Sequence, residues 1–302
     1  MYTLVYGNGF NRLSKDSISW NELLKKIHPL LESTENIPYT VIYEQILLER
    51  PAELPNILKD EEGLKVSIAE LLAKFKTNEF YEHLLDLALP NYLTTNYEHS
   101  LQSTFKEKFN GMVYDNSTED VYSIRRNFSC IQDGVDYCKI WHMHGDVSHP
   151  KSIMLGLDQY CGSVGKIDNY IKGKYDLTLN GEKLKPVRIE EKLKNESFDS
   201  YSWIDLFFST HVYIIGLSLE FSEIDLWWIL NKRARLLKDR LIDRNRNSIV
   251  FYSKSEKVER VKLIESFGIT VIQGKSNQSY EDFYMSAIRD IKSKVGKMEV
   301  NS

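Results

Sequence analysis

Short apolar runs and amphipathic stretches alternate along most of the chain. The run 3–6 is apolar and stops at a glycine, which predicts a first strand. The run 91–95 has the same character and predicts a second buried strand. The segments 139–143 and 152–156 predict two further strands of this kind.

The last third of the chain repeats a simple unit, in which a short apolar run precedes a stretch with helical spacing. This alternation predicts right-handed strand–helix–strand crossovers and a mostly parallel sheet. We therefore expect an α/β protein with a Rossmann-like, mostly parallel sheet and helices on both faces. The units are strands at 211–216, 248–252 and 269–272, followed by helices at 222–240, 256–267 and 279–293.

Helical spacing also fills the chain between the first two predicted strands. Ser19 and Glu22 have the spacing of a capping box, in which each side chain binds a backbone N–H of the first turn. From 35 to 90 the pattern stays helical, and no strand interrupts it. The sequence therefore predicts one α/β domain over 1–302, with a helical insertion at 35–90 that could serve as a lid or an oligomer contact.

Other regions carry weaker patterns. Thr95 and Glu98 repeat the capping-box spacing and predict a helix that begins directly after the second strand. The segment 162–200 is rich in Lys and Glu and predicts a surface excursion. The segment 112–137 is polar and shows no clear helical or strand pattern.

Composition narrows the class of protein. The chain has 302 residues, of which 42% are hydrophobic and 27% charged, as in ordinary globular proteins. Its 39 basic and 43 acidic residues give a net charge of −4, which argues against direct nucleic-acid binding. No apolar run reaches the ~18–20 residues of a membrane span, and the first residues have no signal-peptide pattern. The 3 cysteines form no CxxC pair, so we expect a cytoplasmic protein.

Glycines and short polar side chains follow several predicted strands. In an open parallel sheet, ligands bind beyond the carboxyl ends of the strands, so these residues are candidates for a common site. The groups at successive strand ends are Gly7-Asn8-Gly9-Phe10-Asn11, Thr95-Asn96, His144-Gly145-Asp146 and Gly216-Leu217-Ser218.

The first and last of these groups could hold phosphate. Glycines in a loop let backbone N–H groups approach a pyrophosphate, but Arg12 replaces the third glycine of a dinucleotide loop, and a plain turn is equally open. After Ser218, the predicted helix has Ser222 and Asp225 at its start, where an anion could also bind. Asp225 either completes the helix cap or binds a ligand.

Asn96 and two histidines are the other candidates. Asn96 either caps a helix or offers its amide to a ligand. His142 and His144 share one face of a strand, but an HxH pair, with only Asp146 and His149 nearby, supplies too few ligands for structural zinc. His144 stands at the end of the strand, before a glycine, where its side chain could face a cleft.

Taken in order, these motifs resemble the bacterial sirtuin-like NAD-binding family. The resemblance covers 4–230, and the first and last motifs also resemble abortive-infection proteins of the AbiH type. The matching segments are Gly7-Asn8-Gly9-Phe10-Asn11, Ser19-Trp20-Asn21-Glu22-Leu23-Leu24, Thr95-Asn96-Tyr97, Trp141-His142-Met143-His144-Gly145, and Gly216-Leu217-Ser218 with Asp225-Leu226-Trp227-Trp228.

The departures from the family also carry information. Its protein deacetylases have two CxxC pairs for structural zinc and a Gly-Ile-Pro-Asp-Phe-Arg stretch, and this sequence has neither. Bacterial defence members lack both features as well, and they are NAD glycohydrolases. The resemblance therefore implies an antiphage NAD hydrolase that takes NAD as its substrate and holds no zinc.

The resemblance also implies roles for particular residues. Asn96 would hold the nicotinamide ribose or a water molecule, and His144, with an ordinary pKa near ~6.5, would accept a proton. The residues expected to bind NAD are Gly7, Asn8, Gly9, Phe10, Asn11, Thr95, Gly216, Ser218 and Asp225.

Two alternatives use the same site. One is an ADP-ribosyl transferase, and the other is a module that senses NAD or a related nucleotide without turnover. A toxic hydrolase must also be held inactive, so we expect a homo-oligomer, a separate sensor or activator protein, or both. We expect neither nucleic acid nor membrane as a direct partner.

Overall fold

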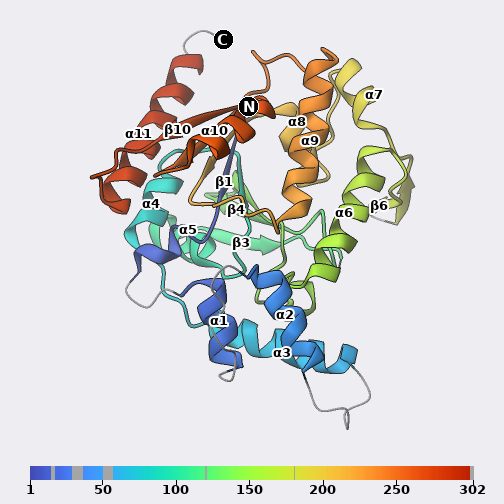
Figure 1. The fold of residues 1–302 in the computed structure, drawn as a ribbon. Coiled ribbons are helices and arrows are strands. Elements are labelled where there is room, and N and C mark those ends of the chain that lie inside the picture. The colour runs from blue at the N-terminus through green and yellow to red at the C-terminus, as the bar shows by residue number, and fades with distance from the viewer. Residues whose placement is uncertain (15–17, 29–36, 50–56, 120, 180, 300–302) are drawn as a thin grey trace.

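A mixed, eight-stranded sheet forms the centre of the molecule (Figure 1). The computed structural model describes residues 1–299 except 15–17, 29–36, 50–56, 120 and 180. The strand order is β10-β9-β8-β1-β2-β5-β4-β3. In this sheet the pairs β3–β4 and β4–β5 are antiparallel, and the other pairs are parallel. The strands are β1 (Tyr2–Tyr6), β2 (Asn91–Thr94), β3 (Met112–Asp115), β4 (Asn127–Gln132), β5 (Val135–His142), β8 (His211–Ile215), β9 (Ile249–Ser253) and β10 (Ile269–Gln273).

The sheet reverses its direction of growth at β1. The chain adds β2 on one side of β1 and later adds β8 on the other, so Tyr6 lies in register with both Thr94 and Ile215. A crevice at such a switch point, beyond the carboxyl ends of the strands, is where α/β sheets of this kind bind ligands. The topology therefore brings together the loops that follow β1, β2 and β8.

Helices cover both faces of the sheet, which confirms the predicted α/β class. Leu4 and Val5 point to opposite faces because side chains alternate along a strand, and each belongs to a different hydrophobic core. The core with Val5 includes α6 (Leu157–Ile171), α7 (Ile189–Lys194), α8 (Trp203–Ser209), α9 (Ile224–Lys238) and α10 (Val258–Ser266). The core with Leu4 includes α4 (Glu79–Leu85), α5 (Ser100–Phe109) and α11 (Tyr280–Glu299).

A third hydrophobic core lies below the sheet in Figure 1, at the carboxyl ends of the central strands. It contains α1 (Trp20–Ile27), α2 (Tyr39–Leu48) and α3 (Ile57–Leu72), together with Tyr97 and Tyr160. Among the described residues, no strand interrupts the chain between β1 and β2. Within the predicted helical segment 35–90, α2, α3 and α4 are helical, and 35–36 and 50–56 lie outside the described residues; α4 packs against the sheet rather than in this third core.

The two predicted capping boxes had different outcomes. The one at the start of α1 is present: the backbone N–H of Glu22 donates to Ser19 Oγ, and that of Ser19 donates to the Glu22 carboxylate. The prediction at Thr95 and Glu98 was wrong, because α5 begins only at Ser100 and its cap residue makes no side-chain bond. Glu98 is instead buried and accepts a hydrogen bond from Tyr81.

Two other assignments were wrong. The segment 152–156 is not a strand, although its central residues are buried and the backbone N–H of Met154 donates to His144 O. Within 162–200, the expected surface excursion, α6 instead buries one face against the core, and Ile167, Tyr170 and Ile171 are part of it. Only the hairpin of β6 (Leu177–Leu179) and β7 (Glu182–Leu184) stands apart from the main sheet.

Candidate functional site

A cavity of about 960 Å³ lies at the switch point, beyond the ends of β1, β2, β8 and β9. Side chains of α1, α2 and α11 complete its walls, among them Trp20, Tyr39 and Tyr284. Of the residues expected to bind NAD, those that line this cavity are Asn8, Gly9, Thr95, Gly216 and Ser218. The remaining ones, Gly7, Phe10, Asn11 and Asp225, do not line it, and neither do Asn96 and His144.

The glycines of the first and last motifs are required by the way their two loops approach each other. A Cβ atom on Gly7 would lie 2.7 Å from the carbonyl oxygen of Gly216, and a Cβ atom on Gly9 would lie 2.8 Å from the Cα atom of Gly216. Gly216 also has a φ of +67°, in the region that favours glycine. The backbone N–H of Gly9 donates to Gly216 O over 2.8 Å, so the glycines join the two loops across the switch point.

Phe10 and Asn11 support the first loop from the core side. The Phe10 ring is fully buried and stacks on Tyr284 with 4.7 Å between the ring centroids. The Asn11 amide accepts a hydrogen bond from Tyr81 and donates one to Asn8 Oδ1 over 3.1 Å. Both residues fix the position of Asn8 and Gly9 without reaching the cavity themselves.

Asn96 has a fully buried side chain whose amide lacks partners. Its backbone N–H donates to Thr94 Oγ1, and its carbonyl oxygen lies 2.9 Å from His142 Nδ1. The side-chain Nδ2 and Oδ1 atoms form no hydrogen bond of good geometry, although the amide lies close enough to Glu98 and Tyr81 to favour their charged forms. An unpaired buried amide costs about 1–3 kcal/mol, and groups of this kind tend to persist where they serve a ligand.

His144 and Asp225 form a buried hydrogen-bonded pair, which is an ion pair when the imidazole is protonated. His144 Nε2 lies 3.0 Å from Asp225 Oδ2, and the two side chains are 1% and 0% exposed. Burial lowers the pKa of His144, but the charge and hydrogen bond of Asp225, with help from Glu223, outweigh it and raise that pKa above its ordinary value. The predicted cap of α9 by Ser222 and Asp225 was wrong, because this helix has no side-chain cap and Asp225 turns to the histidine.

Two tyrosines lie between His144 and the cavity. Tyr160 of α6 places its hydroxyl 3.4 Å from His144 Nδ1, and its ring meets the imidazole edge to face. The hydroxyl of Tyr39, at the start of α2, lies 2.8 Å from that of Tyr160. Tyr39 lines the cavity and Tyr160 does not. The predicted base thus stands behind a layer of aromatic side chains.

Glu223 is a residue of the site that the sequence did not reveal. It lines the cavity with 5% of its surface exposed, and its carboxylate accepts a hydrogen bond from the backbone N–H of Glu220. Burial raises the pKa of Glu223 to about 7, although the nearby His144 lowers it and Asp225 raises it further. An acidic residue at a helix start is common for reasons of the helix dipole alone, so its sequence position carried no signal.

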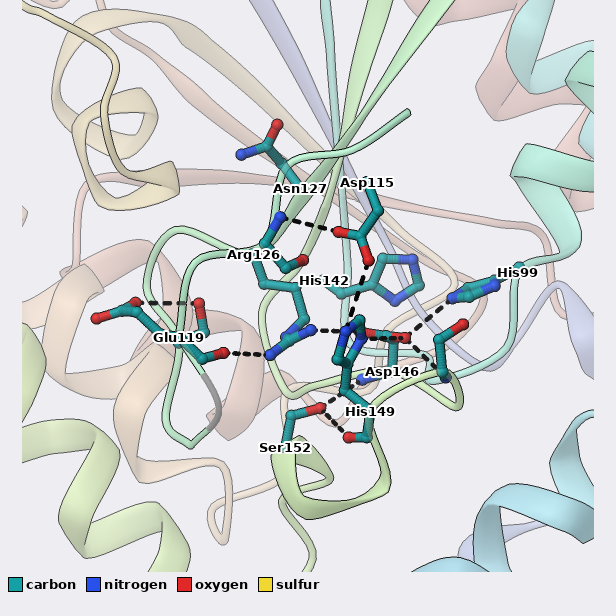
Figure 2. Close-up of polar contacts among 12 residues, drawn as sticks. His99, Asp115, Glu119, Arg126, Asn127, His142, Asp146, His149 and Ser152 are labelled. Carbon is teal, nitrogen blue, oxygen red and sulfur yellow. Dashed lines mark hydrogen bonds and ion pairs between the residues drawn. The ribbon is translucent and has the colours of Figure 1, made fainter. Parts of the chain in front are cut away.

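A second polar cluster occupies the other side of Gly145 (Figure 2). Asp146 and Arg126 form an ion pair of 2.9 Å in which both side chains are fully buried. His99 Nε2 and His149 Nδ1 approach the same carboxylate to 3.2 and 3.3 Å. Burial raises the pKa of Asp146, but the hydrogen bond from His99 and the neighbouring positive charges hold it well below its usual range.

Gly145 separates the two groups. It has a φ of +94°, and a Cβ atom there would lie 2.1 Å from the carbonyl oxygen of Ser152. The backbone can therefore turn sharply, so that His144 contacts Asp225 and Asp146 contacts Arg126. Burial lowers the pKa of the neighbouring His142 to about 4, and its ring bonds Gln102 and the Asn96 carbonyl.

No group of three or more His, Cys, Asp or Glu side chains is placed to hold a metal ion in the described part of the chain. The cysteines Cys130, Cys138 and Cys161 are all free thiols. No helix within the described ranges is long and apolar enough to cross a membrane.

A family model described as the SIR2-like domain matches residues 90–272, more than half of the 302 residues. The chain therefore belongs to the SIR2-like family. The matched part runs from the start of β2 into β10 and includes Asn96, His144 and Asp225. Membership implies that NAD is involved and is consistent with an NAD-dependent enzyme. A comparison with curated proteins gave no match.

Proposed function

We propose that this protein is an NAD glycohydrolase, which cleaves the bond between nicotinamide and ribose. The observation that carries the proposal is the unpaired, buried amide of Asn96, which lies one strand away from the buried pair of His144 and Asp225. An amide without partners and a histidine held by a carboxylate suit a reaction that needs one oriented hydroxyl group and one proton acceptor.

Cleavage of the bond between nicotinamide and ribose requires few other groups from the protein. Nicotinamide leaves its cationic ring as a neutral base, so no strong general acid is required. The positive charge that develops on the ribose is short-lived and reacts with water. In this scheme the Asn96 amide orients the ribose or the attacking water, and His144 accepts the proton that the water loses. The negative charge of Asp225 stabilises the protonated imidazole.

The cavity suits a dinucleotide in size and position. Its volume of about 960 Å³ lies at the upper end of ordinary ligand pockets, and it spans the switch point. The adenosine and phosphates would lie over Gly9, Gly216 and Ser218, and the nicotinamide ribose would point toward Thr95 and the residues behind it. Gly7, Phe10 and Asn11 would act by shaping the first loop.

Hydrolysis is favoured over the two alternatives. A sensor has no use for a buried proton acceptor, whose desolvation is costly unless it is paired. A transferase needs a place for an acceptor beside the ribose, whereas aromatic side chains of α1, α2 and α6 occupy the surroundings of His144 and Tyr97. Product analysis separates the cases, because hydrolysis yields free ADP-ribose and transfer yields a modified acceptor.

The biological role that fits this chemistry is antiphage defence by depletion of NAD in the cytoplasm. A hydrolase of this kind must be silent until it is needed, so activation by a partner protein or by assembly into an oligomer is part of the proposal. Cells that carry the protein with its genomic neighbours should lose NAD and stop growing after phage challenge. Growth arrest with unchanged NAD would contradict this role.

The direct experiment is incubation of the purified protein with NAD, with and without proteins encoded beside it, followed by chromatography of the products. We expect nicotinamide and ADP-ribose in equal amounts. His83→Ala is a matched control, since this histidine lies on α4, its ring packs against that of Phe80, and it does not line the cavity. NAD that stays intact under all these conditions, or ADP-ribose found only on an acceptor, would overturn the proposal.

A further inference from the structure

Two buried tyrosines link the proposed base to the cavity. We propose that Tyr39 and Tyr160 form a proton relay through which His144 acts on a reactant that it does not touch. This inference rests on the proposed NAD hydrolysis and adds two positioning residues to it. Neither residue belongs to the motifs on which the sequence resemblance rests.

The geometry of the relay is continuous. Tyr39 Oη lies 2.8 Å from Tyr160 Oη, Tyr160 Oη lies 3.4 Å from His144 Nδ1, and His144 Nε2 lies 3.0 Å from Asp225 Oδ2. Of these side chains, only Tyr39 lines the cavity, and it is 8% exposed. A proton that moves between the cavity and the imidazole along these hydrogen bonds passes the two hydroxyl groups.

The donor and acceptor of each hydrogen bond in the relay follow from Asp225, the last group in the series. As a carboxylate, Asp225 can only accept, so the neutral His144 carries its proton on Nε2 and accepts on Nδ1. Tyr160 then donates its O–H to Nδ1 and accepts from Tyr39. The Tyr39 oxygen keeps one lone pair for a donor in the cavity. All donors thus point the same way, from the cavity to Asp225.

One concerted step is balanced in atoms and charge. The oxygen of a water molecule bonds to the ribose carbon as the bond to nicotinamide breaks, and the bonding electrons leave with the nicotinamide ring. The water passes a proton to Tyr39, Tyr39 passes its own to Tyr160, and Tyr160 passes its own to His144 Nδ1. Both tyrosines end neutral, and the imidazolium is paired with Asp225.

The surrounding charges favour this concerted form. Burial raises the pKa of both phenols well above its ordinary value, and the negative charges of Glu223 and Asp225 raise it further. Neither tyrosine can therefore hold a negative charge near neutral pH. The groups that face His144 are Asp225 and Glu223 from the start of α9 and Tyr160 from α6. Their balance raises the pKa of His144, which draws the proton inward.

Tyr43 provides a matched control. It lies one helical turn beyond Tyr39 in α2, is fully buried, and also has a hydrogen-bonded hydroxyl group. That hydroxyl contacts Glu61 and Gln159 instead of the histidine. The change Tyr43→Phe removes a buried hydroxyl from the same helix without breaking the relay.

The test compares Tyr39→Phe, Tyr160→Phe and Tyr43→Phe in NAD hydrolysis. We expect kcat to fall by at least ~10²-fold for the first two, with KM nearly unchanged, because general-base transfer contributes ~10²–10⁴-fold. The kcat of Tyr43→Phe should stay within about threefold of the wild-type kcat. Each variant is also melted, so that turnover is expressed per folded molecule. The pH at which kcat rises should differ from the wild-type value in Tyr39→Phe and Tyr160→Phe and should equal it in Tyr43→Phe.

A second readout does not depend on turnover. Nitrogen chemical shifts of the His144 ring should show a proton on Nε2 and a hydrogen bond to Nδ1, and Tyr160→Phe should change only the Nδ1 signal. Wild-type kcat and pH profile in both relay variants, or a rise in kcat in Tyr39→Phe, would overturn the relay. A wild-type protein that leaves NAD intact would instead contradict the proposed function, and the Nδ1 shift would still decide whether the hydrogen-bonded chain exists.

Discussion

The residues on the two sides of Gly145 make similar groups in very different surroundings. On one side, Asp146 is bonded by Arg126, His99 and His149, so its carboxylate is saturated with partners. On the other side, His144 has one firm partner in Asp225 and a long contact to Tyr160, and Asn96 nearby has an amide without partners. Residue type does not distinguish the groups, and Arg126 Nε lacks a partner on the Asp146 side as well; what differs is that the Asp146 carboxylate has a partner on each oxygen, whereas both polar atoms of the Asn96 amide have none of good geometry. We therefore assign chemistry to the His144 side and stability to the Asp146 side.

The largest expected effect is on turnover at His144. His144→Gln keeps a side chain that can donate to Asp225 but removes the titratable ring. We expect NAD hydrolysis per folded molecule to fall by ~10²–10⁴-fold, a loss larger than any decrease in the folded fraction can explain. Steady-state kinetics and a thermal melt check this. A variant with full activity would remove His144 from the mechanism.

Asp146→Asn should lower stability and leave turnover largely unchanged. It leaves the buried guanidinium of Arg126 without a countercharge, and breaking a buried pair in this way costs ~3–5 kcal/mol of the free energy of unfolding. Turnover per folded molecule should stay near that of wild type. Denaturant unfolding measures the stability. Unchanged stability with lost turnover would show that the comparison between the two groups is wrong.

The pH dependence of stability also separates the two sides. The folded-state pKa of His144 is raised, so its contribution is complete below ~6.5 and is lost as the pH rises through the folded-state value. The pKa of Asp146 is lowered, so its contribution is present above ~3.9 and is lost as the pH falls through its folded-state value. Unfolding at a series of pH values should show His144→Gln flattening the alkaline side and Asp146→Asn the acid side. The reverse pattern would contradict the assigned ion pairs.

Glu223→Gln should have a smaller effect on stability. Burial raises the pKa of this carboxyl to about 7, so the folded protein binds a proton that the unfolded chain releases near ~4.3. Stability should therefore decline between these values in wild type and decline less in the variant. We expect a difference on the order of 3 kcal/mol at pH 8, measured by chemical unfolding, because each unit of difference between the two pKa values corresponds to about 1.4 kcal/mol. Parallel pH profiles for the two proteins would show that Glu223 is not desolvated.

Local patterns predicted the parts of the fold that depend on local interactions. The capping box at Ser19 forms because both its partners lie in one turn, and the strand–helix alternation of the last third fixes the parallel sheet. The Thr95 box failed because α5 begins only at Ser100, and the Glu98 side chain is buried beside Tyr81 instead of bonding the backbone of a first helical turn. The antiparallel strands β3 and β4 were not predicted, because β3 is largely exposed and polar residues interrupt the apolar positions of the buried and half-buried β4.

The site was predictable only where it follows strand ends. Asn96, His144 and the glycine loops stand directly after strands, so topology alone brings them together. Tyr39 and Tyr160 come from helices far apart in the chain, and only the packing of the third core places their hydroxyl groups in contact. No spacing rule connects such residues.

Asn96→Ala gives the most direct test of the central claim, because the claim assigns this buried amide to a ligand rather than to the fold. Turnover of NAD per folded molecule and the free energy of unfolding should be measured on the same preparation. We predict that hydrolysis is lost, while stability changes by no more than about 1 kcal/mol, since the amide makes only weak contacts with Glu98 and Tyr81 and no hydrogen bond of good geometry within the described chain. Retained hydrolysis, or a loss of stability that accounts for the lost activity, would contradict the account.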